Sequence, residues 1–219
     1  GVDLPGMRTL VMICLAVMAS ACAVVEAGPD RSDASELRGV SAFHALDIKA
    51  AIDVDVAIGS PGKVELRGPR EWLAKLETRV DDGTLTIAMP GNQRDVPHLR
   101  AVITMPTLDG VHVSGVSHMR IATLAEKVLE VGVSGVATID LAGRADTLVV
   151  KLSGTGEVQA KGLATHDATV GVSGSGNATV RATQDVDVSV SGVGNVTVVG
   201  RPANVKKHIS GIGHVRFES

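Results

Sequence analysis

Apolar and polar residues alternate along most of the chain after residue 42, and the alternation comes in repeats. Six segments share one pattern around a Ser-Gly pair: VHVSGVSHMRI at 111–121, VGVSGVATIDL at 131–141, VKLSGTGEVQA at 150–160, VGVSGSGNATV at 170–180, VSVSGVGNVTV at 188–198 and KHISGIGHVRF at 207–217. Their serines follow one another at steps of 20, 19, 20, 18 and 19 residues. A fixed period of about 20 residues is the signature of a solenoid.

The apolar positions inside each repeat have a spacing of two, which is the period of a β-strand. In the fourth repeat, for example, Val172, Ala178 and Val180 are apolar, whereas Thr179 between the last two is polar. Eighteen to twenty residues leave little room for a crossover helix. Each repeat therefore predicts a short strand, a corner and a second strand, stacked on the next repeat at about 4.8 Å.

The predicted fold is all-β, a parallel β-helix of about six coils around an aliphatic core. Glycine suits the corners because it allows close backbone approach and angles that other residues resist. In the first two corners Ser117 and Ala137 stand where the later corners have a second glycine, so we expect a different turn there. The corner residues are Ser114, Gly115, Ser134, Gly135, Ser153, Gly154, Gly156, Ser173, Gly174, Gly176, Ser191, Gly192, Gly194, Ser210, Gly211 and Gly213.

Residues 42–106 precede the repeats of 107–219 and have a different pattern. Alternating segments at 43–59, 63–68, 83–89 and 101–106 predict strands, and 69–77 predicts a short helix that Pro69 opens. A solenoid needs its first edge covered, so we expect this region to be a cap, with Trp72 as its hydrophobic anchor.

The last coil carries Lys206, Lys207, His208 and Arg216, and two interpretations stay open for them. The charges discourage end-to-end pairing, or the exposed edge is an interface, including one between copies of the chain.

Composition narrows the function. Two Phe, one Trp and no Tyr leave a core of small aliphatic side chains and few aromatic faces for stacking on sugars. The net charge of −3 gives no basic field for nucleic acid. No Gly-x-Gly stretch opens a helix with Lys-Ser or Lys-Thr, so phosphate binding is not supported.

Residues 1–27 have the pattern of an export signal, with Met7-Arg8 before an apolar run. Two alternatives follow: Ala19-Ser20-Ala21-Cys22 is a lipobox that makes Cys22 a lipid anchor, or cleavage occurs after Ala27. The polar segment 28–41 predicts a flexible linker. Since Cys14 and Cys22 are the two cysteines of the chain, the rest has no disulfide and no cysteine metal site.

The stretch from Phe43 to Ser219 resembles the putative auto-transporter adhesin head GIN domain of bacterial exported proteins. The resemblance is carried by IDVDVAIG, KVELRG, the Trp-Leu-x-Lys-Leu-Glu segment, DDGTLTI, ITMP and the serial SGxGxV corners. It implies a right-handed β-helix, export and a role at the envelope or in adhesion. It brings no catalytic motif.

No catalytic, cofactor-binding or metal-ligating residues are expected. His112 and His118 lie on the first coil, and His208 and His214 lie on the last, roughly 24 Å away if coils stack at 4.8 Å, so the pairs cannot share an ion. The outward columns after the corners show no convergence of acids suited to acid–base catalysis.

Three further features have two interpretations each. Asp53 and Asp55 present carboxylates to a cation or, as we favour, form the wet face of a strand. The corner serines line a groove or, as we favour, hydrogen-bond to neighbouring corners. Asn177 and Asn195 begin glycosylation sequons, but we expect them to stack as an amide ladder.

The sequence thus favours a non-enzymatic exported module of the periplasm, outer membrane or cell surface, without a cofactor. Its partner would be an envelope or surface protein or glycan that binds a solenoid face or end. The alternatives are a polysaccharide-active β-helical enzyme and a purely structural periplasmic protein.

Overall fold

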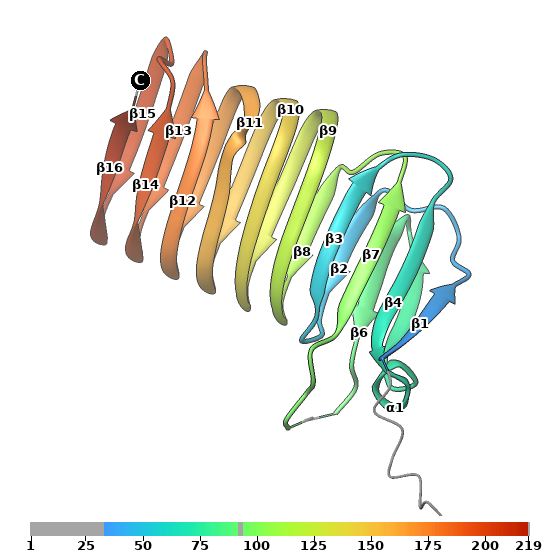
Figure 1. Cartoon of the computed structure of the whole chain (residues 1–219). Helices are drawn as coiled ribbons and strands as arrows, with labels where there is room; N and C mark the ends of the chain where they lie inside the picture. The colour runs from blue at the N-terminus through green and yellow to red at the C-terminus, as the bar shows by residue number, and fades with distance from the viewer. Residues whose placement is uncertain (1–32, 92–93, 219) are drawn as a thin grey trace, which may run out of the picture. The chain divides into compact units, whose positions relative to one another are not determined.

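A computed structural model of the chain describes residues 33–91 and 94–218 (Figure 1). The signal and lipid-anchor predictions on residues 1–27 lie outside these ranges. The described elements are β1 Asp33–Arg38, β2 Ala45–Ile48, β3 Asp53–Ile58, β4 Lys63–Pro69, α1 Arg70–Leu73, β5 Glu77–Asp81, β6 Thr84–Ala88, β7 Arg100–Met105, β8 Gly110–Val113, β9 Val116–Val133, β10 Val136–Leu152, β11 Thr155–Val172, β12 Ser175–Ala182, β13 Asp185–Val190, β14 Val193–Val199, β15 Asn204–Ile209 and β16 Ile212–Glu218.

The strands stack into a β-solenoid with two faces. The first face has the order β1-β4-β7-β3-β9-β10-β11-β12-β14-β16, and the second runs β5-β6-β2-β8-β9-β10-β11-β13-β15. The long strands β9, β10 and β11 run through both faces. From β8 onward every neighbouring pair is parallel, so the predicted all-β solenoid is confirmed.

The number of turns is about five, and the prediction of about six coils was wrong by one. Six Ser-Gly corners, from Ser114 to Ser210, bound five complete turns between them. Counting corners therefore overestimates the turns.

Alternate residues of each strand point inward and form a dry aliphatic core. Val133, Val172 and Val190, the residues before three of the corner serines, are buried. Fully burying a valine or leucine side chain contributes on the order of 1.5–3 kcal/mol. A core without aromatics is therefore sufficient, because every coil adds several such side chains.

The two corners of a coil differ in how they absorb changes in repeat length. At the Ser-Gly corner the coils stay in register, whereas the register between β9 and β10 shifts at Leu141/Gly143, on the opposite corner. The register between β10 and β11 shifts at Asp140/Ala142. The difference between repeats of 18 and 20 residues is therefore taken up at the opposite corner.

A cap built largely of antiparallel strands closes the N-terminal end, as predicted. β4 pairs antiparallel with β7, β1 with β4, and β5 with β6. Leu66 of β4, Leu73 of α1 and Leu76 after it are buried. Trp72 packs against the core, and the Lys75 ammonium lies 4.0 Å from the centre of its ring.

Two expectations for this region need correction. The helix is one turn, Arg70–Leu73, instead of 69–77, because the chain turns so that Leu76 enters the core and Glu77 begins β5. The predicted linker 28–41 contains strand β1. This strand has a polar sequence because it lies at the sheet edge, where backbone pairing with β4 and polar contacts hold it: the Ser35 hydroxyl donates to Glu65, and Arg38 donates to the Leu73 carbonyl.

Candidate functional site

The structure places the six Ser-Gly corners in one stack along an edge of the solenoid. The backbone N–H groups of Ser173 and Gly174 both donate to the Leu152 carbonyl, at 2.9 and 3.1 Å. The next N–H, that of Ser175, donates to the Gly154 carbonyl at 2.9 Å. The same triplet of bonds recurs at each of the other corners from Ser134 to Ser210.

This stacking explains the first glycine of each corner. A Cβ atom on Gly174 would overlap the carbonyl oxygens of Ser153 and Gly154 in the coil before it. Backbone atoms cannot move aside as a side chain can, so the position excludes any larger residue. The Ser-Gly pair is thus a structural element.

The first two corners do differ from the later four. Ala137 is buried in the core, and the buried Ser117 hydroxyl donates to the Ile52 carbonyl at 2.8 Å. In the next coil a Cβ on Gly156 would overlap the Ala137 carbonyl oxygen. The side chain at this position is therefore accommodated only in the coils next to the cap.

The corner serine side chains are exposed and do not act as one group. The Ser153 hydroxyl donates to the Val133 carbonyl at 3.2 Å, which is the predicted bond to a neighbouring corner. The Ser134 hydroxyl instead lies 3.2 Å from the His112 ring. Ser134 is thus a corner serine with an imidazole within hydrogen-bond distance, whereas Ser153 bonds to the backbone.

Next to the serines runs an exposed row that we call the corner ridge: Val116, Val136, Thr155, Ser175, Val193 and Ile212. Val116 is 57% exposed and Val136 is 51% exposed. Two small polar residues interrupt the valines at its centre. The corner ridge is therefore a narrow, broken apolar surface.

The C-terminal end of the solenoid exposes apolar side chains of the core columns. Val205 is 44%, Ile209 40% and Phe217 45% exposed, whereas their partners one coil below, Val186, Val190 and Val198, are buried. A hollow of about 420 Å³ lies here, lined by Gly200, Arg201, Pro202, Val205, Lys207, Phe217 and Glu218. We call this region, β15 and β16 with 200–203, the open end.

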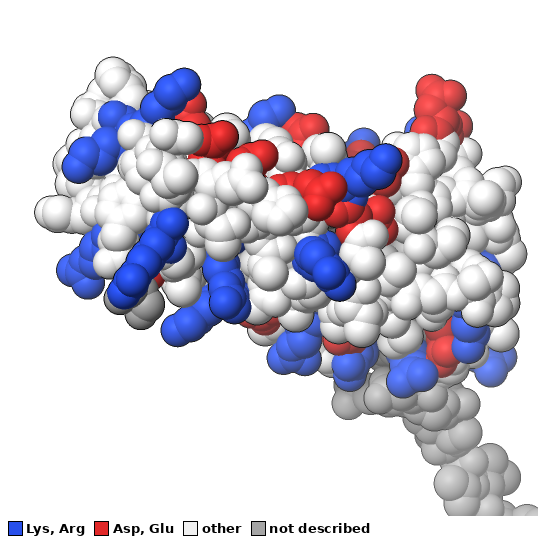
Figure 2. Space-filling view, turned by 90° about the horizontal axis from the view of Figure 1, so that it is seen from above, with Lys and Arg blue, Asp and Glu red and all other residues white. Residues whose placement is uncertain are grey.

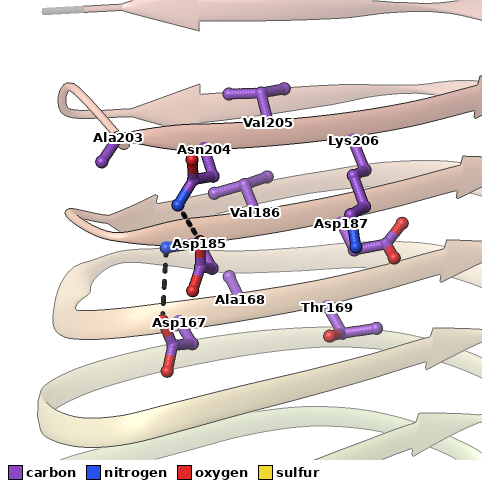
Figure 3. A pocket seen from close by; sticks show the side chains of 10 residues that line it. All are labelled: Asp167, Ala168, Thr169, Asp185, Val186, Asp187, Ala203, Asn204, Val205 and Lys206. Atoms are coloured by element: carbon purple, nitrogen blue, oxygen red, sulfur yellow. Dashed lines mark hydrogen bonds between the residues drawn. The ribbon is translucent and has the colours of Figure 1, made fainter.

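Acidic side chains gather on the second face near the open end, which the sequence analysis missed. Asp167, Asp185 and Asp187 line a hollow of about 600 Å³ together with Asn204 and Lys206 (Figure 3). Asp167 accepts from the Asp185 N–H at 3.2 Å, and Asp185 accepts from the Asn204 amide at 2.7 Å. The expectation of no acidic convergence considered only the columns after the corners, on the other face.

A signal for this acidic hollow was present in the sequence. Asp167 and Asp185 are 18 residues apart, one repeat, and therefore stack. Figure 2, which looks onto the molecule from above, shows Asp and Glu gathered in a band with Lys and Arg alongside it. The acidic hollow is itself of mixed charge, because Lys206 also lines it.

A second hollow of about 600 Å³ lies on the second face beside the cap. It is lined by the small residues Ala45, Gly110 and Gly132 of adjacent coils and by His44 and His112. His44 pairs with Asp109 at 3.2 Å. The other ionisable groups of its lining are exposed or paired, except that the buried Oδ1 atom of Asp47 has no hydrogen-bond partner within residues 33–91 and 94–218.

Most of the remaining predicted residues lie on the first face, whereas His208 lies on β15 of the second face. Asp53 lies 3.6 Å from the His98 ring and accepts from the His118 N–H, and Asp55 pairs with Arg100. Both acids are on the outward side of β3, as expected. The hydrogen bond that Arg100 donates to the Asp55 carboxylate raises the pKa of Arg100.

Asn177 and Asn195 form the predicted amide ladder, with the Asn195 side-chain amide donating to the Asn177 carbonyl oxygen at 3.2 Å. His118 pairs with Asp140 at 3.2 Å. Across residues 33–91 and 94–218, no three His, Cys, Asp or Glu side chains are grouped to hold a metal ion.

The most strongly perturbed carboxylate serves the cap. Glu65 of β4 accepts hydrogen bonds from Arg67, Ser35 and Lys63, which lower its pKa to about 2 from the usual 4.5. The donors come from β4 itself and from β1. Glu65 therefore fastens the edge strand to the cap.

In the part of the chain that the structure describes, no helix has the length and apolar character needed to span a bilayer.

Comparison with protein families identifies a family model that matches most of the chain. The model described as "Putative auto-transporter adhesin, head GIN domain" matches residues 42–202. These residues include the cap and all but the last coil. β15 and β16 follow the matched stretch.

Solved structures of similar fold include a putative adhesin from Bacteroides fragilis, 22% identical over 86% of this chain and 98% of its own, with a TM-score of 0.74. A putative lipid binding protein from Parabacteroides distasonis is 16% identical over 87% and 98%, with a TM-score of 0.51. A putative adhesin from the same species is 23% identical over 86% and 98%, also with a TM-score of 0.51. At these identities the likeness shows the fold. A comparison with curated proteins gives no match.

Proposed function

Because the chain belongs to the head GIN domain family of putative auto-transporter adhesins, we propose that it is a non-enzymatic interaction module of the bacterial envelope that binds through its open end. The observation that carries the proposal is the exposure of the core columns in the last coil. The core columns are buried in the coils before the last one, and they are exposed to solvent at Val205, Ile209 and Phe217. A surface of this kind gains free energy when a partner covers it.

The other surfaces support the proposal less well. The corner ridge is interrupted by Thr155 and Ser175, and in the hollow beside the cap His44 is already paired with Asp109. The flat faces of the solenoid carry small polar residues. They offer few of the large side chains, such as Trp, Tyr and Arg, that contribute most of the binding energy at interfaces.

The test uses beads coated with the full chain and a panel of immobilised envelope proteins, host matrix proteins and glycans. We expect attachment to at least one surface, and loss of that attachment in the double variant Val205→Asp, Phe217→Asp. The matched control is Val116→Asp, Val136→Asp, which places the same two changes on the corner ridge. Attachment that survives in the first variant and disappears in the second contradicts binding through the open end.

The export step is part of the proposal. We expect the mature chain to begin either at a lipidated Cys22 or at Gly28. Mass spectrometry of the N-terminus from a native envelope fraction separates the two, and an intact N-terminal segment in the cytoplasmic fraction contradicts export.

The acidic hollow favours a second candidate, a polysaccharide-active enzyme. Asp187 is exposed there, beside the hydrogen-bonded Asp167 and Asp185. Glycoside hydrolysis needs two carboxyl groups placed about the scissile bond. Incubation of the full chain with a glycan panel tests this, and product formation that stops in Asp187→Asn would replace the adhesin proposal.

A further inference from the structure

One core column of the second face ends in a lysine. From the cap to the open end the stacked residues are Leu85, Leu46, Val111, Val131, Val150, Val170, Val188 and Lys207. The first seven side chains are buried, whereas Lys207 is exposed. Its neighbours at the same level are Val205 and Ile209, two residues away on either side. The open end of β15 thus presents the pattern apolar, cationic, apolar.

The backbone of the last coil is ready to accept another strand. β15 pairs with β13 and β16 pairs with β14, each on one side only within the described residues. Successive peptide groups of such an edge offer N–H donors and C=O acceptors along the solenoid axis. An extended segment can add to this edge as the next rung, at the same spacing of about 4.8 Å.

The charges at the open end select the partner. Arg201, Lys206, Lys207 and Arg216 are all exposed there, and within residues 33–91 and 94–218 none of them forms an ion pair. A second copy joined open end to open end would bring this group of cations onto itself. A carboxylate on the partner would instead be attracted. It would pair with the Lys207 ammonium, which the added rung partly removes from water.

The hollow at the open end gives a place for that carboxylate. Lys207 and Arg201 line it from one coil, and Val205 and Phe217 supply its apolar wall. Its volume of about 420 Å³ is room for an acidic side chain together with an aliphatic neighbour. Glu218 also lines it, so the site combines two cations and one carboxylate with an apolar surface and an open backbone edge, and the cations remain in excess.

We propose that the open end binds an extended strand of a partner protein, added to β15, with a carboxylate opposite Lys207 and aliphatic side chains opposite Val205 and Ile209. The recognition pattern is aliphatic, any, Asp or Glu, any, aliphatic. This inference rests on the proposed function because it names the partner of the same open end.

The probe is the peptide acetyl-Thr-Val-Thr-Glu-Thr-Val-Thr-amide, whose symmetric pattern fits a parallel or an antiparallel rung. Its matched control replaces the glutamate by lysine. Calorimetry with the full chain is expected to show binding of the glutamate peptide at least ten-fold tighter than of the lysine peptide. Equal affinity, or no binding of the glutamate peptide, overturns the proposal.

Charge reversal on the protein separates the site from general electrostatic attraction. Lys207→Glu is expected to weaken the glutamate peptide at least ten-fold and to strengthen the lysine peptide. The control Lys161→Glu makes the same change on an exposed lysine of β11, away from the open end, and is expected to alter either affinity less than two-fold. Equal effects of the two variants overturn the proposal, and circular dichroism verifies that both are folded.

Methylation of peptide amides tests strand addition itself. Alternate N–H groups of a strand point to opposite edges, so only one set can face β15. N-methylation of the central threonines in one peptide, and of the valine and glutamate amides in another, is expected to abolish binding in one case and preserve it in the other. Similar losses in both peptides overturn the rung model.

The two proposals fail separately. If the double variant Val205→Asp, Phe217→Asp loses attachment but the chain binds both peptides equally, the open end remains the binding surface. The proposal of an acidic partner strand is then overturned. If the chain prefers the glutamate peptide but attachment is unchanged in that double variant, the strand-binding site remains. Its role in adhesion is then overturned. Sedimentation that shows the peptide-free chain as a dimer, dissociated by Lys207→Glu, would identify a second copy as the occupant and overturn the acidic partner.

Discussion

The two ends of the solenoid are built on the same aliphatic columns but finish differently. At the N-terminal end, antiparallel strands and one helical turn cover the columns, and Leu66, Leu73 and Leu76 are buried there. At the open end, the columns finish at Val205, Ile209 and Phe217, each two-fifths or more exposed. The N-terminal end is covered, whereas the C-terminal end of the described residues has exposed apolar side chains.

The contrast shows what a β-solenoid needs at its boundaries. Every coil stabilises its neighbours, so a terminal coil lacks half of the stacking that an inner coil has. A cap supplies the missing stacking contacts. Where no cap is present, a charged residue in a core column can remain in contact with water. Lys207 in place of valine is such a residue, since an inward-pointing charge discourages unspecific edge pairing.

The largest expected effect comes from one substitution made at an inner and at the last corner. Gly174→Ala places a Cβ on the backbone of the coil below and should cost more than about 4 kcal/mol of unfolding free energy. Gly211→Ala meets the same kind of contact with Gly192, but only the last coil must shift, so we expect about 1–2 kcal/mol. Urea unfolding followed by circular dichroism measures both.

Equal losses at the two corners would contradict independent movement of the last coil. Val136→Ala, an exposed residue beside the same stack, serves as a control and should change stability by less than about 0.5 kcal/mol.

A smaller difference is expected between apolar truncations at the two ends. Leu73→Ala removes a buried side chain from the cap and should cost about 2–4 kcal/mol. Phe217→Ala removes a larger side chain that is 45% exposed, and we expect at most about 1.5 kcal/mol. The same unfolding experiment applies, and a larger loss in Phe217→Ala would mean that the open end is covered in solution.

The smallest effect concerns pH and the edge of the cap. Because the pKa of Glu65 is lowered to about 2 in the folded protein, its ionised form stabilises the fold above its ordinary pKa of 4.5. This contribution is lost as the pH falls from 4.5 toward 2. The melting temperature of Glu65→Gln should therefore fall less than that of the unchanged protein between pH 5 and pH 3. Parallel curves in calorimetric scans would show that the carboxylate contributes nothing.

The repeats could be predicted from the sequence because burial alone decides their pattern. Each coil has alternating inward residues, and the Ser-Gly steps fix how coils stack. β1 could not be predicted in the same way, since its sequence DASELR has no apolar alternation and its backbone does the pairing. The length of α1 depended on Leu76 entering the core, a tertiary contact that local helix propensity does not contain.

The candidate site was only partly visible in the sequence. The cations of the last coil could be identified from the sequence. Whether they lie at an exposed surface depends on whether another part of the structure covers that coil. The acidic hollow joins Asp167 to Asp185 and Asp187 across two coils of the second face. When the repeats are aligned on the serines, these acids come before the corner. The columns after the corner, on which the prediction was based, do not contain them.

The register shifts at Leu141/Gly143 and Asp140/Ala142 also bear on how such a chain can change in length. The Ser-Gly edge holds every coil in step, so an inserted or deleted residue there would displace all later rungs. The opposite edge already accommodates repeats of unequal length without disturbing the stack. Loops grafted for display, or acquired in the course of evolution, therefore belong on that edge, while growth along the axis proceeds by whole duplicated repeats.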